Sequence, residues 1–97
     1  MIIDIHGHYT TAPPQLRAWR NKQIVEFKPG VPFTDTLTIS DDEIQETIIK
    51  GQLQMQHDRG TSLVLFSPTA GGMAHHYGDA ATSLQWTRTV NDLVKRV

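Results

Sequence analysis

The segment Ile2-Ile3-Asp4-Ile5-His6-Gly7-His8 carries the clearest structural signal in this chain. Its apolar, β-branched residues predict a strand over residues 2–6 that is buried on both faces. Side chains two residues apart on a strand point the same way, so His6 and His8 would project together, about 6 to 7 Å apart along the backbone. Asp4 would share that face, where its carboxylate could orient a histidine. Gly7, on the other face, would let a helix pack closely.

A second apolar run, from Ser62 to Ser67, predicts another strand buried on both faces. Helices are expected over 14–26, from the capping box Ser40-Asp41-Asp42-Glu43 to about residue 59, and over 86–97, where apolar residues recur at helical spacing. The long connection between the two strands indicates that they run parallel. The order of elements predicts an α/β protein.

Two strands are too few for a parallel sheet that has both faces covered, and the last helix shows no stop signal. We therefore expect residues 1–97 to be a fragment of a single larger domain. The apolar flanks of both strands would then be exposed, so self-association into a homo-oligomer is expected of the isolated chain.

The composition is that of an ordinary globular domain, with 38% hydrophobic and 20% charged residues. A formal net charge of −1 provides no overall attraction to nucleic acid or to an anionic membrane, so neither partner is expected. The chain has no cysteine, and any metal ion must therefore be bound by His, Asp or Glu. The first residues do not fit a signal peptide or a membrane span, and a cytoplasmic location is expected.

The first strand is the main candidate for chemistry. A buried strand has little reason to place Asp4, His6 and His8 on one face unless these groups are paired with one another or bind a metal ion. The alternative is that the histidines are polar residues at a strand end that form hydrogen bonds in a turn. The two-residue spacing alone does not decide between these interpretations.

Other polar groups are weaker candidates. His75 and His76 lie in a long Gly-rich loop at 69–79, which would open at the same edge of the sheet as His6 and His8. Adjacent side chains diverge, so at most one of the two would reach that edge, and both could equally be part of a solvated loop. His57 is interpreted as a helix-terminal residue. Arg17, Arg20 and Lys22 are expected on a solvated helix face.

An apolar N-terminal strand that ends in Asp-x-His-x-His resembles the first-strand metal motif of the amidohydrolase superfamily. Further segments, at 1–11, 18–21, 39–43, 66–68 and 73–76, resemble hydratases in the branch that also contains aminocarboxymuconate-semialdehyde decarboxylase. The resemblance covers most of the chain and is weakest over 28–38.

This resemblance implies that the chain is the N-terminal βα portion of a (β/α)₈ TIM barrel built around a divalent metal ion, Zn²⁺. His6 and His8 would be zinc ligands, and the remaining ligands would come from later strands that this sequence lacks. His75 or His76 would help to bind a carboxylate of the substrate.

The implied reaction is the addition of water across a carbon–carbon double bond of a small tricarboxylate in bacterial gallate and protocatechuate degradation. The isolated chain would be inactive. The alternatives are another hydrolase or decarboxylase of the superfamily, or a non-catalytic fragment.

Overall fold

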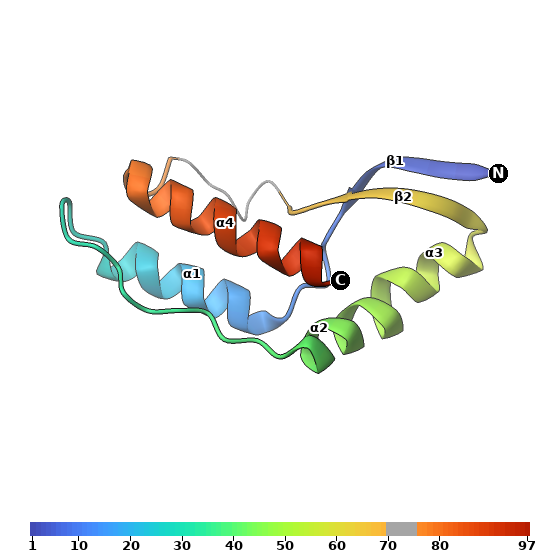
Figure 1. Ribbon diagram of the computed structural model, residues 1–97, viewed down its shortest axis with the longest axis horizontal. Coiled ribbons are helices and arrows are strands. Elements are labelled where there is room, and N and C mark those ends of the chain that lie inside the picture. Colours follow the sequence, from blue (N-terminus) through green and yellow to red (C-terminus); the bar gives the residue numbers. More distant parts are fainter. Residues whose placement is uncertain (70–75) are drawn as a thin grey trace.

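The computed structural model describes residues 1–69 and 76–97. Its elements, in chain order, are β1 (Ile2–His8), α1 (Pro14–Glu26), α2 (Asp41–Thr47), the π-helix η1 (Ile48–Leu53), α3 (Gln54–Asp58), β2 (Thr61–Ser67) and α4 (Ala80–Arg96). The strands pair in parallel, which confirms the α/β class and the expected direction. Figure 1 shows α1 and α4 side by side at one end of the molecule, with the strands and the α2–α3 segment at the other end. No helix in the described ranges is long and apolar enough to cross a membrane.

The pairing of β1 with β2 contains an irregularity beside the two histidines. Asp4 is aligned with Val64, whereas Gly7 is aligned with Phe66, so three steps along β1 match two steps along β2. One extra residue in β1 is typical of a β-bulge. Beyond the bulge, each side chain of β1 points to the face opposite the one it would have in a regular strand. The element that packs closely against Gly7 is strand β2 and not the expected helix, because a Cβ atom at Gly7 would lie 2.2 Å from Val64 Cγ1.

The bulge also corrects the expectation that Asp4 shares a face with both histidines. Asp4 is aligned with Val64, and His8 is aligned with Ser67. Val64 and Ser67 are three residues apart on β2 and so point to opposite faces. Asp4 therefore lies on the face opposite His8. Its Oδ1 accepts a hydrogen bond from the His6 backbone N–H at 2.9 Å, so it holds the main chain of β1 instead of an imidazole.

The hydrophobic core lies on one side of the sheet. Its buried members come from the end of β1, the segment before α2, the α2–η1 helix and α4: Tyr9, Ile39, Ile44, Ile48 and Leu93. A second buried contact joins the other helices, where Trp86 Nε1 of α4 donates a hydrogen bond to Gln23 Oε1 of α1 at 2.7 Å. The buried residues Trp19 and Gln23 of α1 thus face the buried residues of α4, which include Trp86.

The expectation that both strands are buried on both faces is wrong for this chain. Ile5 is 77% exposed and Leu65 is 57% exposed, and Ile3 and Leu63 are also exposed. The physical reason is that the helices pack against one face only, and no element within 1–69 and 76–97 covers the other.

The helix expected from residue 40 to 59 is present but changes its winding. The capping box at its start is confirmed, because the Ser40 side chain accepts from the Glu43 amide and the Glu43 side chain accepts from the Ser40 amide. From Ile48 to Leu53 the helix is a π-helix, and α-helical winding then resumes. Such turns are rare and are frequently found at functional sites.

The capping box predicts a specific pH dependence. Hydrogen bonds from the backbone and side chain of Ser40 hold the pKa of the Glu43 carboxyl below its usual value. A carboxyl whose pKa is lowered on folding stabilises the fold above its unfolded-state pKa, and this contribution is lost as pH falls through the folded-state pKa. We expect Glu43→Gln to lower the urea midpoint at pH 7 and to match the wild type in strong acid. A difference that persists unchanged in acid would contradict this.

Candidate metal centre

His6 and His8 converge at the carboxyl end of β1. Their Nε2 atoms are 2.8 Å apart, and the rings meet edge to face with centroids separated by 4.6 Å. His6 is exposed and His8 is half-buried, so the position between the two nitrogens is accessible from solvent. The predicted projection of both imidazoles to one face is confirmed.

His8 is held from its other ring nitrogen by the end of β2. Its Nδ1 lies 2.9 Å from Ser67 Oγ and 3.0 Å from the carbonyl oxygen of Pro68. Ser67 Oγ also donates to the carbonyl oxygen of Gly7 at 3.1 Å. A metal-binding histidine typically has such a partner on the nitrogen that faces away from the metal.

The arrangement fits two ligands of one metal ion. Zinc–nitrogen bonds of about 2.0–2.1 Å at a tetrahedral angle place two ligand nitrogens roughly 3.3 Å apart. The observed separation of 2.8 Å between the Nε2 atoms needs only a small outward movement to reach that distance. Within the described ranges, no three His, Asp or Glu side chains gather to hold an ion.

The π-helix supports the end of β1 through Gln52, which is buried. Its Nε2 donates to the carbonyl oxygen of His8, and its Oε1 accepts from the Thr10 N–H at 3.2 Å. Both contacts tie the two residues that flank Tyr9 to η1. The apolar stripe of this helix did not single out Gln52, because a π-turn changes which residues face inward.

Tyr9 anchors the same turn from the core side. Its hydroxyl lies 2.8 Å from Thr47 Oγ1. Burial raises the pKa of the Tyr9 phenol, although the hydrogen bond with Thr47 acts in the opposite direction. The phenol is therefore neutral at physiological pH and serves as a packing and hydrogen-bonding group beneath His8.

His76 is not brought to the metal centre. It lines a small cavity with Gln23, Phe27 and Trp86 at the far end of α1, and its ring contacts the Tyr77 ring in a tilted arrangement with centroids 4.3 Å apart. The thirteen residues of α1 span about 20 Å, and β1 leads into the opposite end of this helix. His75 lies outside the described residues, so its substrate-binding role stays a prediction.

The other polar candidates lie in different surroundings. His57 is exposed at the end of α3, 3.7 Å from Asp58, which agrees with a helix-terminal role. Lys22 forms an ion pair with Asp35. Arg17 is exposed on α1, whereas Arg20 is partly buried.

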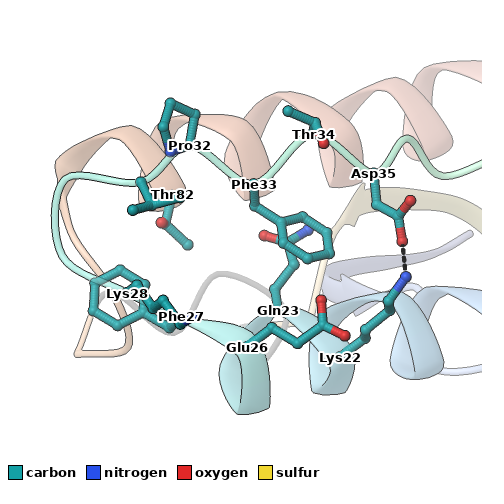
Figure 2. A pocket seen from close by; sticks show the side chains of 11 residues that line it. Lys22, Gln23, Glu26, Phe27, Lys28, Pro32, Phe33, Thr34, Asp35 and Thr82 are labelled. Carbon is teal, nitrogen blue, oxygen red and sulfur yellow. Dashed lines mark hydrogen bonds and ion pairs between the residues drawn. The ribbon is translucent and has the colours of Figure 1, made fainter.

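Two of the hollows that α1 helps to line are large. One, of about 470 Å³, lies at its carboxyl end, and Figure 2 shows the Lys22–Asp35 ion pair at its rim and the Phe33 ring over the opening. It carries charges of both signs. The other, of about 540 Å³, is the strand-end hollow, lined by Tyr9, Thr10, Pro13, Arg17, Arg20 and Thr69. Tyr9, which follows His8 in the chain, lines this second hollow.

Comparison with known proteins points to one class of enzyme. No protein-family model matches the chain. Over all 97 residues it is 45% identical to a 2-keto-4-carboxy-3-hexenedioate hydratase of a Sphingobium species, and it covers 28% of that protein. The crystal structure of 4-oxalomesaconate hydratase from Rhodopseudomonas palustris matches 99% of the chain at 47% identity with a TM-score of 0.82.

Over its whole length, the chain is thus similar to proteins that are named as hydratases. The chain spans 28% of the length of each of the two relatives, so it corresponds to a part of them.

Proposed function

We propose that this chain supplies the first metal-binding strand of a hydratase that acts on a small unsaturated tricarboxylate. The observation that carries the proposal is the convergence of His6 and His8 Nε2, 2.8 Å apart, at the end of a parallel strand. This geometry occurs in a chain that is 47% identical to the matching part of 4-oxalomesaconate hydratase.

The name of the Sphingobium relative contains 2-keto-4-carboxy-3-hexenedioate, which is one compound of the proposed substrate class. The compound has three carboxylates, a ketone and a carbon–carbon double bond next to the ketone. Recognition of such an anion requires cationic donors, and guanidinium groups suit carboxylates because they present paired N–H donors. Arg17 and Arg20 line the strand-end hollow, whose volume of about 540 Å³ lies in the usual range for small-molecule sites.

In this proposal His6 and His8 hold a divalent ion, zinc, through their Nε2 atoms. When bound, the ion supplies Lewis-acid chemistry toward an oxygen of the substrate or of water. A catalytic zinc normally has three protein ligands. We therefore propose that the further ligands and the group that moves the proton at carbon come from later strands of a (β/α)₈ barrel. A hydrolase or decarboxylase would share this metal centre, but both relatives are named as hydratases.

A chimera tests the proposal directly. Residues 1–97 would replace the matching segment of 4-oxalomesaconate hydratase from R. palustris, and hydration of 4-oxalomesaconate and bound zinc would be measured. We expect the chimera to contain zinc and to turn over the substrate within about tenfold of the parent enzyme, while the isolated chain shows no turnover.

The parent hydratase, purified in parallel, serves as the control. A chimera that folds like the parent and binds zinc but does not hydrate the substrate would refute the hydratase proposal. A folded chimera without zinc would refute the metal centre itself. Turnover by the isolated chain would contradict the expectation that further ligands are needed.

A further inference from the structure

The surroundings of His8 determine which of its ring nitrogens carries the proton. The carbonyl oxygen of Pro68, 3.0 Å from His8 Nδ1, can only accept a hydrogen bond. A neutral imidazole has one N–H donor and one acceptor nitrogen. The contact is favourable only if Nδ1 carries the hydrogen. The other nitrogen, Nε2, then presents a lone pair.

Ser67 reinforces this assignment. Its hydroxyl lies 3.1 Å from the carbonyl oxygen of Gly7, which again can only accept, so the hydroxyl hydrogen is directed there. The lone pairs of Ser67 Oγ then face His8 Nδ1 at 2.9 Å. Nδ1–H is shared between two acceptors, both supplied by the end of β2. The His8 ring therefore takes its position only when β1 and β2 are paired.

His6 is in a different situation. Its Nε2 lies 2.8 Å from His8 Nε2. If His8 Nε2 is an acceptor, His6 Nε2 must carry the hydrogen that joins the two rings. That hydrogen must leave before His6 Nε2 can bind a metal ion, and the neutral ring then carries its proton on Nδ1. Because His6 is exposed, water can accept the proton from Nε2 and return one to Nδ1.

We propose that Ser67 and the Pro68 carbonyl hold His8 as a preset ligand, with Nδ1 protonated, whereas His6 changes tautomer when the metal ion binds. Ser67 is thus a positioning residue of the metal centre. The inference rests on the proposed function for its link to a metal, but the tautomers belong to the metal-free chain and can be measured there.

The test is nitrogen-15 NMR of the histidine rings in the metal-free chain, combined with zinc titration of the chimera, which also contains the later strands, against a competing chelator. In the metal-free wild type we expect His8 to be protonated at Nδ1 and His6 at Nε2, and zinc to move the His6 proton to Nδ1. In Ser67→Ala we expect a fraction of His8 to adopt the Nε2–H tautomer. Zinc affinity should fall about 10- to 100-fold, as for other partners of metal ligands.

Two variants separate positioning from a general structural effect. Ser67→Thr keeps the hydroxyl and should restore both readouts. Ser62→Ala removes another cross-strand serine contact, that of Ser62 Oγ with the Ile2 N–H at the start of the same strands, and should change neither.

Wild-type His8 protonated at Nε2 would overturn the inference, as would a Ser67→Ala variant with unchanged tautomers and zinc affinity. The predicted tautomers in the metal-free chain, together with a folded chimera that binds no zinc, would support the assignment for the metal-free state and refute the metal proposal instead.

Discussion

His8→Ala is expected to abolish zinc binding and hydration by the chimera. In the proposed metal centre, His8 is one of the two ligands from the described part of the chain, and its Nδ1 contacts with Ser67 and Pro68 connect it to β2. Loss of a partner behind a ligand typically costs 10–100-fold, so loss of the ligand itself should exceed about 100-fold in zinc affinity. Metal content after dialysis and kcat/KM for 4-oxalomesaconate would measure the effect.

His57→Ala is the matched control for this variant. His57 is a histidine of the same chain, but it is exposed at the end of α3, where its Nδ1 lies 3.7 Å from Asp58 Oδ1. The His57→Ala chimera should have the same zinc content and the same kcat/KM as the unsubstituted chimera, within experimental error. If His8→Ala retained stoichiometric zinc and substantial turnover, the two-histidine centre would be wrong, whatever the fold of the variant.

Trp86→Ala is expected to be the most destabilising single substitution in the helical layer. Trp86 is 1% exposed, and its Nε1 donates to Gln23 Oε1 at 2.7 Å. Removal of a buried tryptophan side chain typically costs about 3–5 kcal/mol. A domain has a free energy of unfolding of only about 5–15 kcal/mol, so this variant would be unfolded or close to it at room temperature. Urea unfolding followed by circular dichroism measures the loss.

Leu84→Ala offers a control on the same helix. Leu84 is 51% exposed on α4, and substitution of an exposed residue usually changes stability by less than about 0.5 kcal/mol. Trp86→Phe keeps most of the buried ring and removes the hydrogen bond, so its cost should fall between the other two. Similar losses for Trp86→Ala and Leu84→Ala would show that α4 does not pack on α1 as described.

The sequence alone determined the elements whose causes are local. The bounds of α1, from Pro14 to Glu26, follow from proline in the first turn and from helical spacing. The start of α2 follows from a capping box within four residues. The joint projection of His6 and His8, whose Nε2 atoms are 2.8 Å apart, is what the two-residue repeat of a strand predicts.

Tertiary structure decided everything that depends on a partner distant in sequence. The bulge that separates Asp4 from His8 arises where Gly7 meets Val64 and Leu65 of β2, 57 and 58 positions along the chain. The same holds for two contacts of His8: Gln52 of the π-helix donates to its carbonyl oxygen, and Ser67 contacts its Nδ1. Both contacts join segments far apart in sequence, and a local sequence pattern does not predict them. The sequence therefore indicated which residues could bind a metal, whereas the packing of β2 and η1 against β1 decided how those residues are held.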